Sequence, residues 1–204
     1  MAVSDAGERT EWYWLCHMPA QGAEKRYYGQ LDVAPQPVPP ERAARLQKAF
    51  PEHAVWVSSP LSRAVTTALA LINGKPPIAV GDFTEQDFGK WQGRSFADVF
   101  AENRTLDWSQ PHEIVPPGGE SFYDLGERVA DAIDRLSEHY AGKAIVAVAH
   151  QSVIRVAIAY ALELEADQAW RVSVAPLSLT RLGLQVKDGK KLWSVGCINA
   201  EIGQ

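Results

Sequence analysis

The sequence predicts an α/β fold, a three-layer sandwich in which a mainly parallel β-sheet carries helices on both faces and ends in a C-terminal antiparallel hairpin. Three observations support this class. Short apolar runs alternate with segments of helical periodicity along the chain. The run at residues 144–149 is apolar throughout, as a strand covered on both faces requires. The pair Asp188-Gly189 separates two further apolar runs, which is typical of a hairpin turn.

Length and composition predict a single domain over residues 1–204. The chain has 204 residues, of which 46% are hydrophobic, so it is long enough to bury a sizeable core. We find no internal repeat and no linker. We expect one cap-like excursion at about residues 88–120, because residues 103–119 are rich in Pro, Gly and Trp and look irregular.

The first half of the chain alternates predicted strands and helices. Residues 12–16 form an aromatic and aliphatic run that stops at His17, so we expect a buried strand that ends in a loop. Ser59 is placed to cap a helix with Pro60 at its first position. The expected apolar stripe of that helix is Leu61, Val65, Leu69 and Ile72. The other elements expected here are a helix at 41–50 and strands at 54–58 and 78–80.

The second half follows the same alternation. Ser95 with Asp98 predicts a capped helix, and Ser121 opens a longer one. The apolar stripe of the longer helix is Phe122, Leu125, Val129, Ile133, Leu136 and Tyr140. The remaining expected elements are a strand at 144–149, a helix at 151–162 and hairpin strands at 177–186 and 191–198.

Charge and cysteine content exclude several classes of protein. A formal net charge of −5 argues against a broad nucleic-acid or membrane-surface interface. Only Cys16 and Cys197 are present, as is usual in a reducing compartment, so we expect a cytoplasmic protein. We see neither a secretion signal nor an apolar run long enough to span a membrane.

Two histidines and one arginine follow predicted strands. In α/β sheets of this kind, ligands bind at the carboxyl ends of the strands. His17 and His150 lie at two such ends, and Arg63 lies in the first turn of a helix just beyond a third. Cations near a helix amino terminus favour a bound anion, so this arrangement predicts a phosphate-like substrate.

These residue types suit phosphoryl transfer. A neutral imidazole can attack phosphorus and hold the phosphoryl group covalently, while fixed donors such as Arg63 match the charge on its oxygens. A carboxylic acid can protonate the leaving oxygen and later accept a proton from water. Glu85, in a loop near the strand ends, is the best candidate for this acid.

Four segments, in order from about residue 12 to residue 160, resemble the motifs of the histidine phosphatase superfamily, which is phosphoglycerate mutase-like. They are Leu15-Cys16-His17, Ser58-Ser59-Pro60-Leu61-Ser62-Arg63-Ala64, the segment from Glu85 to Gly93, and Val148-Ala149-His150 with Ile154-Arg155. The resemblance implies that His17 is the nucleophile, that Arg63 and His150 bind phosphate and that Glu85 is the proton donor. Residues 28–33 and 117–121 resemble the branch that includes alpha-ribazole phosphatase.

Cys16 stands where the family has an arginine, so one cationic phosphate ligand is missing. By its position Cys16 is a candidate substrate-binding residue, and the sequence permits the alternative that Arg26 or Lys25 folds back and supplies the charge. Cys16 is not the nucleophile of a cysteine phosphatase, because the arginine needed six positions on is Gly22. His17 and His150 show no metal-ligand spacing, so we expect no metal and no other cofactor.

The expected activity is metal-independent hydrolysis of a small phosphorylated metabolite, alpha-ribazole phosphate-like, through phosphohistidine. The expected partners are that metabolite and inorganic phosphate, with no nucleic acid and no membrane, and a homodimer stays open. Two alternatives also stay open. One is a phosphoglycerate-type mutase, and the other is an impaired binding or regulatory pseudophosphatase, which the loss of the arginine at Cys16 would favour.

Overall fold

The computed structural model describes residues 8–22, 25–72 and 74–202. Part of the segment on which we based the expectation of no secretion signal, residues 1–7, lies outside these ranges. The strands are β1 (Arg9–Cys16), β2 (Val55–Ser58), β3 (Ile78–Ala79), β4 (Ala144–Ala149), β5 (Ser178–Lys187) and β6 (Lys190–Glu201). The α-helices are α1 (Pro40–Gln47), α2 (Ser62–Leu69), α3 (Phe96–Glu102), α4 (Phe122–His139), α5 (Gln151–Leu162) and α6 (Ala166–Trp170). Within the described residues, no helix is both long and apolar enough to cross a bilayer.

The six strands form one sheet in the order β3-β2-β4-β1-β5-β6. The pairs β1–β4, β2–β4 and β2–β3 are parallel, whereas β1–β5 and β5–β6 are antiparallel. The mainly parallel sheet with a closing hairpin is therefore confirmed. At the hairpin, Asp188 and Gly189 both have positive φ, 51° and 73°, as a tight turn of this type requires.

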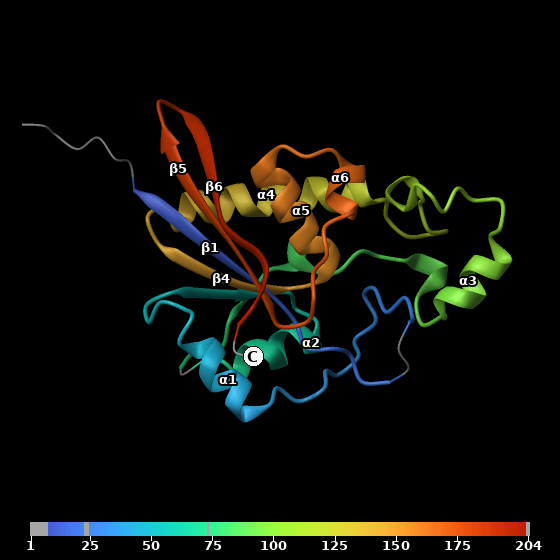
Figure 1. Ribbon diagram of the computed structural model, residues 1–204, viewed down its shortest axis with the longest axis horizontal. Helices are drawn as coiled ribbons and strands as arrows, with labels where there is room; N and C mark the ends of the chain where they lie inside the picture. The colour runs from blue at the N-terminus through green and yellow to red at the C-terminus, as the bar shows by residue number, and fades with distance from the viewer. Residues whose placement is uncertain (1–7, 23–24, 73, 203–204) are drawn as a thin grey trace, which may run out of the picture.

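Helices cover both faces of the sheet. In Figure 1, α4, α5 and α6 lie on one side of the strands, and α1 and α2 lie on the other. Side chains alternate along β1, so that Trp12, Trp14 and Cys16 enter one buried cluster and Leu15 enters a second. The two clusters form the two apolar interfaces of a three-layer sandwich.

The long elements begin and end close to the predicted residues. Both β4 and α5 have the expected bounds, and α4 opens on a capping box between Ser121 and Asp124. The Ser95 cap of α3 is also confirmed, since its hydroxyl accepts a hydrogen bond from the Asp98 amide at 3.0 Å.

The prediction for α2 was wrong in two respects. The helix begins at Ser62 after the N-cap residue Leu61, and no side chain caps it. Its buried residues are Arg63, Ala64, Thr67 and Ala68, while Leu69 of the expected apolar stripe is 49% exposed. The helix therefore turns a partly polar face toward the sheet, which an apolar pattern does not reveal.

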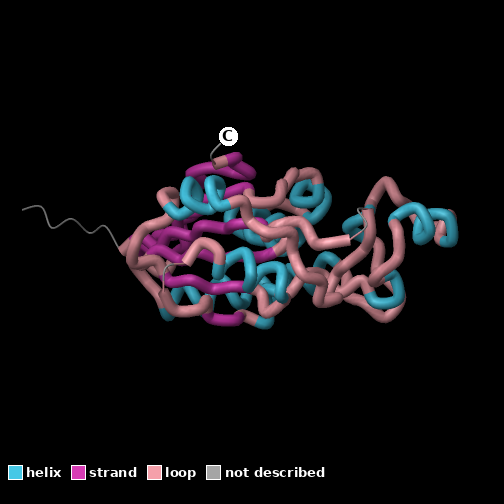
Figure 2. Tube along the Cα trace, turned by 90° about the horizontal axis from the view of Figure 1, so that it is seen from below, coloured by secondary structure: helices cyan, strands magenta, loops and turns pink. Residues whose placement is uncertain are grey.

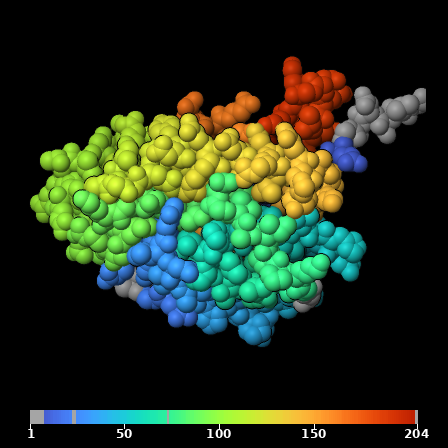
Figure 3. Space-filling view, turned by 180° about the vertical axis from the view of Figure 1, so that it is seen from behind, coloured from blue at the N-terminus to red at the C-terminus, as the bar shows by residue number. Residues whose placement is uncertain are grey.

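The part of the chain around α3 lies at the opposite end of the molecule from the β5–β6 hairpin. Figures 1 and 2 show the strands gathered toward one end and a loop-rich part with α3 at the other. From behind, the green α3 region and the red hairpin stand at opposite ends of Figure 3, with yellow atoms of α4 between them. Two short 3-10 helices, Gly81–Phe83 and Gly89–Trp91, lead into this part and a third, Pro111–Glu113, lies within it.

Candidate active site

The two histidines meet because β1 and β4 are parallel neighbours. Cys16 pairs with Ala149 in the register, and the backbone amide of His17 donates to the carbonyl of Ala149 at 3.0 Å. The next residue on β4 is His150. The ring centroids of His17 and His150 lie 4.8 Å apart, with the planes inclined at 64°. The predicted meeting of these residues at the strand ends is thus present in the structure.

Two hydrogen bonds define the tautomer of His17. Its Nδ1 bonds to the backbone carbonyl of Met18, which accepts only, so Nδ1 carries the proton. Its Nε2 lies 3.3 Å from Nε of Arg63, which donates only, so Nε2 presents a lone pair. Burial lowers the pKa of His17 to about 4, and the charge of Arg63 adds to this effect. His17 is therefore a neutral imidazole near pH 7 with an unprotonated Nε2.

Arg63 is buried beside His17 by the start of α2. Only 2% of its surface is exposed. Besides the contact with His17, Nη1 donates to the carbonyl of Leu31 at 2.9 Å and Nη2 to the carbonyl of Gly29 at 2.5 Å. The guanidinium thus joins the strand-end histidine to the segment that contains residues 29–31. Three of its five donor positions are engaged in these contacts.

His150 is fully buried and is the N-cap residue of α5. Its Nε2 lies 2.7 Å from Oγ of Ser59, and its Nδ1 has no hydrogen-bond partner among the described residues. Burial holds the pKa of His150 well below its usual range, and the charges of Arg63 and Arg128, together with protonation of His17, act in the same direction. Both strand-end histidines are therefore uncharged.

The Glu85 carboxyl lies beside the amino terminus of α5. Oε1 accepts a hydrogen bond from the Gln86 amide at 2.8 Å. Burial raises the pKa of Glu85 above its ordinary value, although hydrogen bonds from Gln86 and Ser152 and the charge of Arg63 oppose the change. A carboxyl group that keeps its proton to higher pH is suited to general acid catalysis.

A partly buried ion pair anchors the backbone at Glu85. Arg128 donates through Nη2 to the carbonyl of Glu85 at 3.2 Å and to Oε1 of Glu120 at 2.5 Å, and through Nε to Oε2 of Glu120 at 3.0 Å. Gln30 Nε2 also donates to the Glu85 carbonyl, at 3.1 Å. Gln30 and Glu120 lie in the segments 28–33 and 117–121 singled out above, but sequence reasoning missed Arg128, because it is separated from Glu85 by 43 positions and lies in no motif.

Cys16 lies under the site as an uncharged thiol. It is 1% exposed and belongs to the core cluster that faces α4 and α5. Burial and then the Glu85 carboxylate raise the pKa of Cys16 to about 12, while Arg155 and Arg63 act in the opposite direction. The guanidinium of Arg155 is held by Val172, whose carbonyl accepts from Nε at 2.8 Å, and by stacking 5.1 Å from the Trp170 ring.

Arg26 bonds to the segment that precedes α3, and its role as a phosphate ligand stays a prediction. Its Nη1 donates to the carbonyl of Gly93 at 2.7 Å, and its backbone pairs with Ser95. The site therefore brings together five of the six predicted residues: His17, Arg63, His150, Glu85 and Cys16.

The site combines one fixed cation with two neutral imidazoles, an uncharged thiol and a carboxyl group whose pKa is raised by burial. This set can bind an anion, supply a nitrogen nucleophile and transfer one proton. Among the residues that the structure describes, no group of three or more His, Cys, Asp or Glu side chains is arranged to hold a metal ion.

Sequence comparison gives a family match over most of the chain. The pattern that defines the histidine phosphatase superfamily (branch 1) matches residues 10–195. A bifunctional protein of Mycobacterium tuberculosis is 35% identical over 131 residues, 62% of this chain and 36% of that protein. This chain thus matches little more than a third of that relative's length. The adenosylcobalamin/alpha-ribazole phosphatase of Escherichia coli is 31% identical over 121 residues, 57% of this chain and 60% of that enzyme.

Comparison of structures gives the same architecture. The structure of a mycobacterial glucosyl-3-phosphoglycerate phosphatase superposes with a TM-score of 0.81 and 24% sequence identity, covering 95% of this chain and 100% of that one. At this identity, the likeness concerns the fold alone.

Proposed function

The chain belongs to the histidine phosphatase superfamily, and from this premise we propose that it hydrolyses phosphomonoesters of small metabolites through a phosphohistidine at His17. The observation that carries the proposal is the tautomer of His17. Its Nδ1 is bonded to the Met18 carbonyl, and its unprotonated Nε2 lies 3.3 Å from the Arg63 guanidinium. An attacking lone pair and a cation for the phosphoryl oxygens therefore lie side by side.

The first step forms a bond between His17 Nε2 and phosphorus while the bond from phosphorus to the ester oxygen breaks. The Glu85 carboxyl gives its proton to the departing oxygen, so the product leaves as an alcohol. In the second step water attacks phosphorus, the Glu85 carboxylate takes a proton from it, and the bond to Nε2 breaks. Inorganic phosphate leaves, and His17 and Glu85 regain their starting states. Arg63 and His150 hold the phosphoryl oxygens in both steps.

Within this proposal the reaction needs no metal, and the substrate panel begins with alpha-ribazole phosphate. The E. coli phosphatase named for that substrate is 31% identical, which supports testing it first. Phosphoserine, sugar phosphates and 3-phosphoglycerate complete the panel. A mutase would convert 3-phosphoglycerate to 2-phosphoglycerate without release of phosphate.

The test measures phosphate release from this panel with EDTA present, by wild type and by His17→Ala. His53→Ala is the matched control, because it removes an exposed histidine that is not part of the candidate site. We expect release by wild type and by His53→Ala, and none by His17→Ala. Trapping of an acid-labile, base-stable phosphoenzyme in the first two proteins alone would identify the intermediate. Release that is unchanged in His17→Ala would refute the mechanism.

A second candidate function is binding of phosphate esters without turnover, and the buried neutral Cys16 favours it. Cys16→Arg separates the two. A charged hydrogen bond to the phosphoryl group is worth roughly 1.5 to 3 kcal/mol, so restoring one should raise the rate by about ten- to a hundredfold. His17-dependent release by neither wild type nor Cys16→Arg would favour the binding protein.

A further inference from the structure

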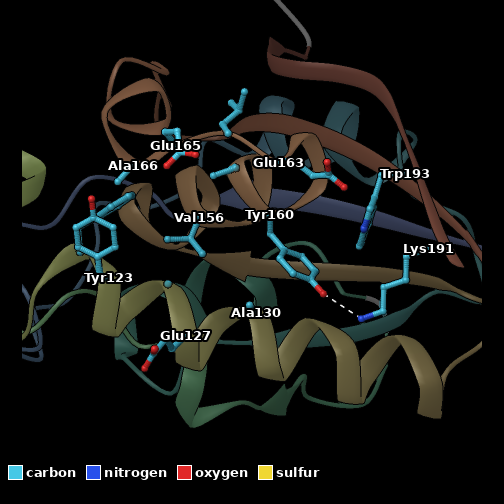
Figure 4. A pocket seen from close by; sticks show the side chains of 14 residues that line it. Tyr123, Glu127, Ala130, Val156, Tyr160, Glu163, Glu165, Ala166, Lys191 and Trp193 are labelled. Carbon is cyan, nitrogen blue, oxygen red and sulfur yellow. Dashed lines mark hydrogen bonds between the residues drawn. The ribbon is translucent and has the colours of Figure 1, made fainter.

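A cavity that opens to solvent lies where α4, α5, α6 and β6 meet. Its volume is about 540 Å³. Figure 4 shows side chains from α4 along one side and from α5 and β6 along the other. Neither His17, Arg63, His150 nor Glu85 is among its lining residues. A volume of this size accommodates a small organic molecule.

The cavity exists because small side chains meet where α4 faces α5. Gly126 and Ala130 lie one helical turn apart on α4, and Ala159 lies opposite on α5. A Cβ atom at Gly126 would meet nothing within 4 Å, so space remains above this part of the helix. A larger residue at Gly126 would fill the cavity and would also favour the helix.

Aromatic rings form its walls. Tyr160 of α5 and Trp193 of β6 stand edge to face, with ring centroids 5.9 Å apart, and Tyr123 of α4 lies toward the opposite end (Figure 4). Aromatic faces carry partial negative charge, so they attract cations as well as flat apolar groups.

The charge on the rim is negative. Lys191 is the sole basic residue among the described residues that line the cavity, and its Nζ lies 2.5 Å from Oδ2 of Asp134 and donates to the Tyr160 hydroxyl at 3.0 Å (Figure 4). Its charge is thus neutralised locally. Glu127 and Glu163 line the same cavity, and within the described ranges neither carboxylate has an ion-pair partner.

The position of Glu163 has no explanation in the stability of its helix. It is the C-cap residue of α5 in the left-handed conformation, with φ of 53°, where glycine or asparagine is favoured. A carboxylate there also faces the negative end of the helix dipole. Residues that break local rules without local compensation are often functional.

We propose that this cavity binds an organic cation with a flat apolar body, such as an arylalkylammonium ion. The aromatic walls take the body of the ligand, and the two unpaired carboxylates, Glu127 and Glu163, complement its positive charge. This inference does not rest on the proposed phosphatase activity, because the two sites share no residue.

The test uses 2-phenylethylammonium as the probe, with 2-phenylethanol and phenylacetate as its neutral and anionic counterparts. Calorimetric titration of the whole protein should give at least tenfold tighter binding for the cation than for phenylacetate, with the alcohol between them. Binding by His17→Ala should equal that by wild type, which separates this inference from the catalytic proposal. Equal affinity for all three compounds would overturn it.

Two variants locate the binding. Glu127→Gln/Glu163→Gln should weaken binding of the cation at least tenfold and abolish the preference over phenylacetate, while Glu138→Gln, an exposed carboxylate on the same helix, should change nothing. Gly126→Leu should abolish binding by filling the cavity while keeping the protein folded. Undiminished binding by either cavity variant would contradict the proposal. So would sedimentation in which Gly126→Leu dissociates a dimer and no compound binds, because the occupant would then be a second copy of the chain.

Discussion

The orientation of the His17 ring depends on neighbours from two parts of the chain. Met18, the next residue, fixes Nδ1, and Arg63, on a different element, faces Nε2. Thr67 connects the two, since its Oγ1 accepts from the Met18 amide at 3.0 Å and donates to the Arg63 carbonyl at 2.7 Å. His17, the proposed nucleophile, is therefore positioned by hydrogen bonds to two residues that are themselves joined through Thr67.

Cys16 should be chemically inert in the folded protein. The thiolate is the reactive species, and burial raises the pKa of Cys16 to about 12. With iodoacetamide at pH 8, we expect no alkylation of Cys16 on a timescale on which the unfolded chain reacts completely. Mass spectrometry of peptides distinguishes it from Cys197, which is partly exposed and serves as the internal comparison. Rapid labelling of Cys16 together with loss of phosphate release would show that Cys16 is not a buried, unreactive thiol.

Gly29 should be intolerant of a side chain. Its φ is 51°, and an added Cβ would lie 2.9 Å from the Gln86 carbonyl oxygen, inside the contact distance of backbone atoms. Because the Gly29 carbonyl accepts from Arg63, a shift here moves the cation. We expect Gly29→Ala to lower kcat/KM about tenfold or more and to cost roughly 1 to 3 kcal/mol of stability.

Gly189→Ala is the matched control for this prediction. Gly189 also has positive φ, 73°, but a Cβ there would meet nothing within 4 Å. It should lose a comparable amount of stability from the backbone alone and keep full activity. If both variants retain full activity, the close approach of Gly29 to the Gln86 backbone does not determine the position of the Arg63 guanidinium.

The helices and strands predicted most accurately from the sequence are those that a local pattern of residues defines. A continuous apolar run marks β4, and a capping box with a long apolar stripe marks α4. The predicted cap and apolar stripe of α2 were wrong, because the hydroxyl of Ser59 bonds to His150 and Thr67 faces inward and bonds to the Met18 amide. Tertiary hydrogen bonds of this kind leave no trace in apolar periodicity.

The candidate site shows the same division. His17, His150 and Arg63 were predictable because each follows a strand, and parallel strands bring their carboxyl ends together. The pair of Arg128 and Glu120 was not predictable, since nothing in either local segment indicates that the two meet behind Glu85. Folding alone creates that contact.

This ion pair should position Glu85. The test uses Arg128→Lys, because lysine keeps the charge of this partly buried pair but loses the planar fork that bonds to both Glu120 oxygens. We expect kcat to fall about tenfold with little change in KM, and the alkaline limb of the pH profile to shift. Both follow if the Glu85 carboxyl moves relative to the leaving oxygen.

Arg135→Lys is the matched control on the same helix. Arg135 pairs with Asp82 at 2.6 Å, but both side chains are largely exposed, so the change should leave stability within about 0.5 kcal/mol and the pH profile unaltered. An Arg128→Lys enzyme with a wild-type profile and wild-type kcat would show that the pair supports the fold and not the acid.

For the whole molecule, strand order is what creates the site. Because β1 and β4 are central neighbours and β2 follows β4, the three chain segments that leave their carboxyl ends converge. Covering both faces of this sheet also buries the groups at its end. The two histidines are therefore kept neutral by the same packing that stabilises the sandwich, which links the active site to global stability.

This linkage predicts that the protein loses stability as the pH falls below about 6.5. The unfolded chain then protonates its histidines, whereas the pKa of folded His17 is lowered to about 4 and that of His150 also lies well below its usual range. The unfolded state binds more protons, so stability present above pH 6.5 is lost as the pH approaches 4. His17 alone accounts for on the order of 2 kcal/mol at pH 5.

Protonation of Glu85 changes the folding stability in the direction opposite to protonation of His17, so variants at the two positions should respond differently to pH. Its pKa is raised on folding, so the folded state holds this proton more tightly and gains relative stability as the pH falls toward 4.5. In urea unfolding between pH 7 and pH 5, His17→Asn should therefore lose less stability than wild type, and Glu85→Gln should lose more. Parallel curves for the three proteins would mean that neither group changes its proton affinity on folding, and the neutral histidine on which the proposed attack depends would lose its physical basis.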